Sequence, residues 1–341
     1  MGFFSSVFSV QFVVKSIIKG VPLLYGSTGE ILTEKSGHLN LGIPGIMYMG
    51  AVGGIFGGYL YEKFKGGFLY YENLTGGFNV PVCILITVLF CLLFSLLGGL
   101  IYSVLTITLR ANQNVSGLAL TTFGTGLANF LGGSLSKLTA SGVSTALPLT
   151  GKIYRASIPF LSDHLGVVGE LLFSYGFMTY LSIILAVLCA VYLKKTRQGL
   201  NLRSIGENPA AADAAGINVV KYKYLAILAG SLIAGLGGLA YVMEYIGGVW
   251  QNSVLGDAGW LAIAIVIFVL WKPARAIWGA FLFGALCVLF NYLIVSPAMQ
   301  EIIKMLPYII TIIILVVSSL RKKRENQPPE RLGLPYFRED R

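Results

Sequence analysis

The stretch from Asn73 to Leu109 reads NLTGGFNVPVCILITVLFCLLFSLLGGLIYSVLTITL and contains no charged residue. A membrane-spanning helix needs about 20 consecutive, mostly apolar residues, and this stretch is longer than that. Helices and strands of soluble cores rarely lack charge over such a length. The stretch therefore predicts a transmembrane helix.

Other stretches of the chain share this character. Uncharged runs suitable for further spans lie at Leu39–Tyr61, Ala111–Ser136, Leu171–Leu193, Tyr224–Met243, Ala258–Trp271, Ala276–Gln300 and Met305–Leu320. A weaker candidate at Ser9–Leu32 is interrupted by Lys15, Lys19 and Glu30. We expect an all-α, polytopic transmembrane bundle of about eight to ten spans, with Ser36–Gly45 as a candidate re-entrant segment.

The composition agrees with a membrane protein. Charged residues make up 12% of the 341 residues, about half the share found in soluble domains, which argues against a soluble enzyme. The excess of Lys and Arg (25) over Asp and Glu (15) fits basic cytoplasmic loops better than nucleic-acid binding. The four cysteines lie inside apolar runs and the two histidines are isolated, so the sequence predicts neither a metal site nor a catalytic one.

The basic residues also predict an orientation. With the run Arg321–Arg324 in the cytoplasm and nine alternating spans, most basic residues fall on the same side, and the N-terminus falls outside. The residues expected inside include Lys35, Arg110, Lys194, Lys195, Arg197, Arg203, Lys221, Lys223, Lys272 and Arg275. We divide the chain into a transmembrane domain (1–321), which includes an inner loop at about 194–223, and a charged, mobile tail (322–341).

The inner loop contains the signals of a short helix. Asn208 is a good N-cap, Pro209 suits the first helical position, and Gly216 suits the left-handed position that ends a helix. Because so short a helix is unstable alone in water, it must pack on something. It is either a surface helix on its own bundle or a docking helix for a cytoplasmic partner. The chain contains no GxxxxGK[ST] phosphate-binding loop, so an ATPase would be a separate chain.

Four motifs, in order along the chain, resemble those of bacterial ABC importer permeases. They are GEILTEKSGHLNLGIPGIM (29–47), LRANQNVSGLAL (109–120), GENPAAADAAGI (206–217), and GWLAIAIVIF (259–268) with LPY at 306–308. The family also serves ribose and branched-chain amino acids, and the chain is most similar to the shorter permease of nucleoside-type importers. The resemblance covers about residues 15–320. Pro44 departs from the pattern, because many relatives carry Glu there.

The resemblance implies a permease subunit in the bacterial cytoplasmic membrane that moves a nucleoside or similar small polar solute by alternating access. Its implied partners are a second, related permease, a cytoplasmic ATPase that binds the ATP, and an extracytoplasmic solute-binding lipoprotein. The chain itself would hold no cofactor. The segment implied to dock the ATPase consists of Glu207, Asn208, Pro209, Ala211, Ala212, Ala215 and Gly216.

Polar residues inside spans are expensive and are therefore candidates for a solute pathway. The candidates are Asn40, Asn112, Gln113, Asn114, Ser116 and Asn291. Helix capping, a turn cap or hydrogen bonds between helices explain most of them equally well. We expect Glu30 to snorkel or to pair with Lys35 or Lys15, and Glu244, near the outer face, to be solvated.

Small residues recur every four positions in two of the apolar runs. They are Gly50, Gly54 and Gly58 in the first, and Gly230, Ala234 and Gly238 in the second. Small residues at this spacing let helices approach closely in lipid, so we interpret them first as packing positions and second as positions that line a pore.

The sequence leaves other functions open. The solute could instead be a sugar or a riboflavin-like compound. A stand-alone secondary transporter would need titratable groups in the membrane, for which Glu30 is the best candidate. An intramembrane enzyme would need a catalytic constellation that the sequence does not show.

Overall fold

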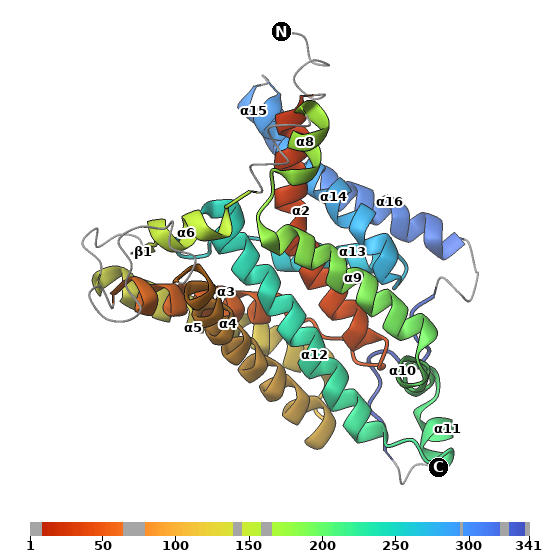
Figure 1. Cartoon of the computed structure of the whole chain (residues 1–341). Helices are drawn as coiled ribbons and strands as arrows, with labels where there is room; N and C mark the ends of the chain where they lie inside the picture. The colour runs from red at the N-terminus through yellow and green to blue at the C-terminus, as the bar shows by residue number, and fades with distance from the viewer. Residues whose placement is uncertain are drawn as a thin grey trace.

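The computed structural model describes residues 9–63, 79–138, 145–157, 166–293, 296–320 and 327–337. The described chain is almost entirely helical, as expected of an all-α bundle (Figure 1). Residues 73–78 at the start of the apolar stretch above, and the run Arg321–Arg324, lie outside the described residues.

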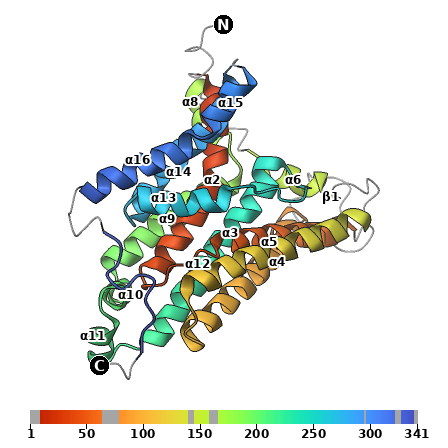
Figure 2. The same ribbon diagram turned by 180° about the vertical axis from the view of Figure 1, so that it is seen from behind.

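Helix α2 (Val10–Glu34) lies at the centre of the bundle, and every residue from Gly20 to Glu34 is buried. Figures 1 and 2 show it with α9 (Phe177–Lys195) and α12 (Val219–Ala240) on one face, and with α13 (Ala258–Phe268) and α14 (Pro273–Leu289) on the other. Lys19 is accommodated in this helix because its Nζ donates to the Tyr241 hydroxyl at 2.9 Å and lies 4.4 Å from the ring centroids of Tyr241 and Tyr245. The weakest expected span is therefore the central helix.

A second group of helices packs beside α12. It consists of α3 (Ile43–Lys63), α4 (Asn79–Ser103), which continues into the π-helical turn η1 (Val104–Thr108), and α5 (Gln113–Leu138). Helix α3 is mostly buried, whereas α4 exposes Leu85, Leu89 and Leu93, one on each turn of its outer face. An apolar stripe of this kind is what lipid would cover.

The remaining elements are short segments and the C-terminal helices. The short segments are β1 (Thr145–Ala146), α6 (Pro148–Tyr154), α8 (Gly166–Phe173), α10 (Arg197–Glu207), α11 (Pro209–Ala214), the π-helical η2 (Tyr241–Ile246), β2 (Val249–Trp250) and the 3-10 turn η3 (Phe290–Tyr292). Strands β1 and β2 pair antiparallel, with Thr145 opposite Trp250. The chain ends with α15 (Pro297–Lys304) and α16 (Leu306–Leu320).

Six helical segments in the described part of the chain are long and apolar enough to cross a membrane. They are Ile43–Glu62, Val80–Thr108, Phe177–Lys195, Val219–Ile246, Pro273–Tyr292 and Pro297–Ile314. Helices α2 (25 residues) and α5 (26 residues) are as long. They are not among the six because neither is both as apolar and as poor in charged residues as those segments are. Helix α13 is apolar and short, with 11 residues, as the brief run Ala258–Trp271 predicted.

Residues 35–42 connect α2 to α3 as a buried turn, with Ser36, His38 and Asn40 each at most 1% exposed. These eight residues contain no helix of their own. The turn lies at the same end of the bundle as α10, α11, the start of α12, the η1–α5 connection and residues 327–337 (Figure 1). We refer to this end as the α11 end. Helix α2 begins at the opposite end.

Candidate functional site

The α11 end carries the short helix that the inner loop predicted. The Asn208 side chain caps it, because Oδ1 accepts from the Ala211 N–H at 3.0 Å. Pro209 occupies the first helical position, and Gly216 adopts a left-handed φ of 81° after the last turn. The N–H of Ile217 then donates to the Ala212 carbonyl at 3.0 Å, which closes the end of the helix.

Helix α11 has one face on the bundle and one face free. Pro209 and Ala212 are buried, and Ala212 packs against Ile205 and Val219. The outward residues are Glu207, Asn208, Ala211, Ala214, Ala215 and Gly216, and all of these are exposed. The two alternatives for this helix are therefore compatible, because it packs on its own bundle and still presents a smooth alanine surface.

Asn208 offers a test of how much the cap matters. Replacing it with alanine removes the acceptor for the Ala211 N–H and is expected to destabilise α11 locally by about 1 kcal/mol. Hydrogen exchange of the backbone amides from Ala211 to Ala214 should become roughly fivefold faster, while exchange in α12 stays unchanged. Asn218→Ala is the matched control, because Asn218 caps α12 in the same way through the Lys221 N–H. Unchanged exchange in α11 would contradict the capping role.

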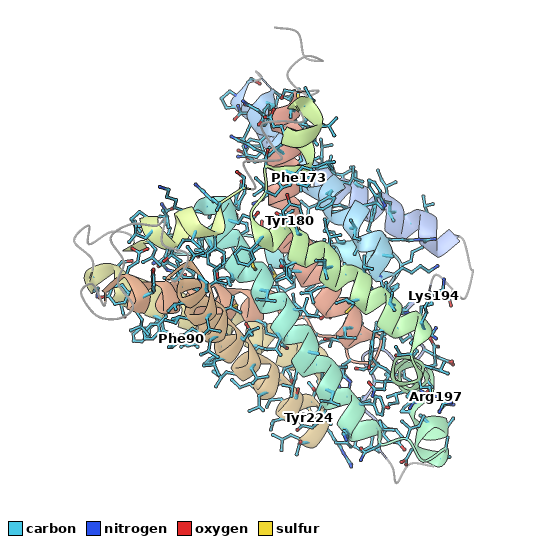
Figure 3. All side chains as sticks on the ribbon, in the orientation of Figure 1. Phe90, Phe173, Tyr180, Lys194, Arg197 and Tyr224 are labelled. Carbon is cyan, nitrogen blue, oxygen red and sulfur yellow. The ribbon has the colours of Figure 1, made fainter. Side chains whose placement is uncertain are left out.

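Helix α10 precedes α11 and was not among the expected elements. Thr196 caps it by accepting from the Gly199 N–H at 3.0 Å. Its buried residues are Gly199, Leu202, Ile205 and Gly206, which follow the spacing of an amphipathic helix. The spacing of these four residues was the sequence signal that could have predicted α10. It was missed because polar residues lie between them. Figure 3 shows Lys194 and Arg197 at the junction of α9 and α10, near the α11 end.

The C-terminal tail lies against the α11 end. The Arg331 N–H donates to the Gly206 carbonyl at 3.1 Å, and the Gly333 N–H donates to the Gly37 carbonyl at 3.2 Å. The Tyr336 hydroxyl donates to Asp213 Oδ2 at 3.1 Å. The expectation of a mobile tail is therefore wrong for residues 327–337, which join the α2–α3 turn to α10 and α11.

The candidate pathway residues fall into separate groups. Asn40, Gln113 and Ser116 are buried around the contact between the α2–α3 turn and the start of α5. Gln113 Oε1 accepts from the Leu39 N–H at 2.9 Å, and Asn40 Oδ1 accepts from the Gly42 N–H at 2.9 Å. Asn40 Nδ2 has no hydrogen-bond partner among the described residues. Asn40 therefore keeps a buried amide donor available.

The other candidates are exposed. Asn112 Oδ1 accepts from the N–H groups of Asn114 and Val115, so Asn112 caps α5. Asn114 is exposed beside it. Asn291 is exposed in η3, which follows α14. The three amides at 112–114 therefore do not face one site. Gln113 faces the protein interior, whereas Asn112 and Asn114 are exposed.

The expectations for the acidic residues of the spans are wrong. Glu30 is fully buried and makes no ion pair with Lys15 or Lys35; its Oε1 accepts from the Asn40 N–H at 3.0 Å. Glu34, one turn later, is also buried and accepts from the Trp271 indole N–H. The two carboxyl groups therefore hold the α2–α3 turn and the end of α13 to the central helix.

Glu244 is 5% exposed rather than solvated. Its Oε1 accepts from the Gly176 N–H at 3.0 Å and from the Thr179 hydroxyl at 2.6 Å. The Arg155 guanidinium donates to the Glu244 backbone carbonyl at 3.0 Å. Glu244 thus holds the start of α9 and the segment after α6 together, at the end of the bundle opposite to α11.

The small residues of the two stripes lie where helices touch. A Cβ atom on Gly50 would lie 2.5 Å from the Gly235 carbonyl oxygen, and a Cβ atom on Gly230 would lie 2.5 Å from that of Gly29. A Cβ atom on Gly238 would overlap the Met47 carbonyl oxygen. Gly54 lies against Leu239 and Gly58 against Leu147 and Thr150, while the Ala234 backbone lies against Gly29.

Comparisons with known proteins agree with this architecture. Residues 12–315 match the family described as "Branched-chain amino acid transport system / permease component". The nucleoside ABC transporter permease protein NupC of Lactococcus lactis is 32% identical over 89% of this chain and 91% of its own length. The guanosine ABC transporter permease protein NupQ of Bacillus subtilis is 30% identical over 95% of both chains.

The putative glucose ABC transporter permease protein TsgC13 of Haloferax volcanii is 31% identical over 77% of this chain and 72% of its own length. No solved structure matches the chain. Together, the apolar helices and the family match show that this is a multi-pass membrane protein. The chain belongs to the family of permease components of the branched-chain amino acid transport system, and it is a permease subunit of an ABC importer.

Proposed function

We propose that this permease moves a nucleoside, or a solute with the same hydrogen-bonding groups, across the bacterial cytoplasmic membrane. The observation that carries the proposal is similarity along almost the whole chain to permeases named for nucleosides and guanosine, NupC and NupQ. The proposed mechanism is alternating access between two arrangements of the bundle. It involves no covalent chemistry in this chain.

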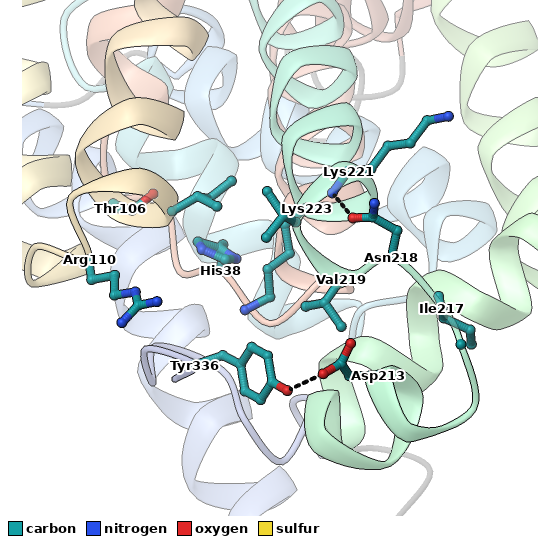
Figure 4. A pocket seen from close by; sticks show the side chains of 13 residues that line it. His38, Thr106, Arg110, Asp213, Ile217, Asn218, Val219, Lys221, Lys223 and Tyr336 are labelled. Atoms are coloured by element: carbon teal, nitrogen blue, oxygen red, sulfur yellow. Dashed lines mark hydrogen bonds between the residues drawn. The ribbon is translucent and has the colours of Figure 1, made fainter. Parts of the chain in front are cut away.

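We propose that the α11 end faces the cytoplasm and docks a separate ATPase, which binds the ATP. The exposed alanine surface of α11 supports this, because it is smooth and is fixed to the bundle by Ala212. A second observation supports the same orientation. Four basic residues that were expected inside lie on connections or near helix ends at this end of the bundle (Figures 3 and 4), namely Lys35, Arg110, Lys194 and Lys223. A second, related permease and an extracytoplasmic solute-binding lipoprotein complete the proposed importer.

The substrate proposal is tested by competition for uptake. The complex that contains this chain would be reconstituted in liposomes with ATP inside, and uptake of radiolabelled guanosine would be measured. Unlabelled nucleosides at a hundredfold excess are expected to reduce the signal by more than tenfold, because the competitors share one site. Glucose, riboflavin and leucine are expected to leave it unchanged. Absence of guanosine uptake, together with ATP-driven uptake of radiolabelled glucose by the same liposomes, would transfer the assignment to sugars, in line with the relative TsgC13.

A further inference from the structure

A pocket at the α11 end gathers basic side chains from distant parts of the chain. Its volume is about 660 Å³, and its lining includes His38, Arg110, Lys221 and Lys223. They come from the α2–α3 turn, the η1–α5 connection and the first two turns of α12 (Figure 4). A volume of this size is typical of sites that hold small molecules.

Two of these side chains are buried and lack a strong partner. Lys223 is 5% exposed, and no ion pair joins it to a carboxylate among the described residues. Its Nζ lies 5.9 Å from the centroid of the Tyr336 ring. His38 is 1% exposed, and its Nδ1 has no hydrogen-bond partner in the described part of the chain. Burying a cation and a ring nitrogen in this way is costly unless something compensates them.

Figure 4 shows the Lys223 ammonium, the His38 ring and the Arg110 guanidinium directed toward the same space above Tyr336. Burial, together with the nearby Lys223 ammonium, holds the pKa of His38 well below its usual value. An anion in the pocket would offset the Lys223 charge and allow His38 to take up a proton and donate from Nδ1. The three groups can then act on one ligand.

The backbone adds to this arrangement. Helix α12 begins at Val219, and Val219 and Val220 line the pocket. Asn218 already accepts from the Lys221 N–H, but the N–H groups of Val219 and Val220 have no acceptor within the helix, and the N-terminal end of a long helix favours negative charge. The carboxylate among the lining residues, Asp213, is engaged by the Tyr336 hydroxyl. The charge balance of the pocket therefore favours an anion.

We propose that this pocket binds a small phosphate monoester, with its phosphate held by Lys223, His38, Arg110 and the N-terminal end of α12. The wall formed by Tyr336, Ile107 and Ile217 would accommodate the organic part of the ligand. An acidic side chain on a docked protein is the less suitable occupant, because Lys223 and His38 lie buried behind the tail residue Tyr336. The proposal does not depend on which solute the permease imports.

Occupancy of the pocket would also affect α11. Asp213 and Gly216, which belong to the α11 segment, lie in the pocket wall, so a bound ester would fix this segment against α12 and the tail. This step rests on the docking role proposed above. Under that role, a phosphorylated product that accumulates in the cytoplasm would alter the coupling between the ATPase and transport.

The experiment is equilibrium dialysis of the purified importer complex in detergent, with radiolabelled inorganic phosphate and a radiolabelled nucleoside 5′-monophosphate as probes. One saturable site per chain is expected, with a dissociation constant below about 1 mM. Lys223→Gln and Arg110→Gln are each expected to weaken binding about tenfold, because each removes a charge-assisted hydrogen bond. Arg110 is exposed, so its substitution tests the site without disturbing the core.

Lys195→Gln is the control, because Lys195 is exposed at the same end of the bundle and does not line the pocket. Its binding of both probes is expected to equal that of the unmodified complex. The absence of saturable binding up to about 10 mM, or equal losses in the control and in the Arg110 variant, would overturn the proposal.

Two further comparisons identify the source of the anion. In nanodiscs, loss of probe binding when phosphatidic acid, a lipid phosphate monoester, replaces neutral lipid would support the site and identify a lipid headgroup as its ligand. Unchanged binding would identify a free ester. Binding by the permease freed of its ATPase, but not by the whole complex, would assign the pocket to an acidic side chain of the ATPase and overturn the proposal.

Discussion

Replacing Gly238 with alanine is expected to destabilise the folded chain, although alanine is the better helix former. The added Cβ atom would overlap the backbone carbonyl oxygen of Met47 on the neighbouring helix α3. Backbone atoms cannot rotate away as a flexible side chain can, so α3 and α12 would have to separate. Overpacking of this kind costs typically about 1–3 kcal/mol, which exceeds the gain of up to about 1 kcal/mol in helix propensity.

The measurement is the thermal unfolding of the purified chain in detergent. Gly126→Ala is the matched control, since Gly126 also lies in a helix, α5, and a Cβ atom there would meet no atom within 4 Å. The control is expected to leave the melting temperature unchanged or to raise it slightly, whereas Gly238→Ala lowers it by several degrees. A Gly238 variant that melts at or above the temperature of the unmodified chain would disprove the close approach of α3 and α12.

The sequence predicted the helices wherever apolarity and length were sufficient. The run Ala111–Ser136 corresponds to α5 at Gln113–Leu138, and the run from Asn73 to Leu109 contains α4 and η1. Boundaries were less accurate where charges lie inside a helix. Helix α12 begins at Val219, whereas the uncharged run began at Tyr224. The run started too late because Lys221 and Lys223 lie in the first two turns of the helix, and a run without charge leaves them out.

Contacts between distant residues could not be predicted from the sequence. No signal in the sequence pointed to a partner for Glu34, whose carboxylate accepts from the indole N–H of Trp271, far along the chain. Tyr336 was assigned to a mobile tail because its neighbours are charged and Pro-rich, while its actual partner, Asp213, lies far away along the chain. No local pattern encodes such pairs, since they arise only when the helices pack.

Helix α11 combines a feature that the sequence predicted with one that it could not predict. The cap at Asn208, the position of Pro209 and the turn at Gly216 are local signals, and the structure contains the helix they predict. The sequence of the segment does not determine which of its alanines face outward, because this depends on how the helix packs against the rest of the bundle. Ala211 is exposed, whereas Ala212 packs against Ile205 and Val219. A charged residue at position 212 would therefore disturb the bundle itself, and position 211 is the one that tests docking.

Replacing Ala211 with arginine is accordingly expected to uncouple the ATPase from uptake while leaving the permease folded. A bulky charged side chain on the smooth outer face of α11 would hold the two proteins apart, and loss of a central contact costs an interface typically 2 kcal/mol or more, roughly thirtyfold in affinity. ATP-driven uptake in liposomes should fall by at least about tenfold, and less ATPase should co-purify with the permease. Melting of the permease in detergent should stay unchanged.

Ala156→Arg is the control for added charge, because Ala156 is exposed after α6, at the end of the bundle opposite to α11. ATPase co-purification with this variant should match that of the unmodified chain. Ala212→Arg should instead lower the melting temperature, since Ala212 is buried. If Ala211→Arg keeps both full uptake and full ATPase binding, α11 is only a surface helix of its own bundle, because a docking face that tolerates an arginine at its centre makes no contact there.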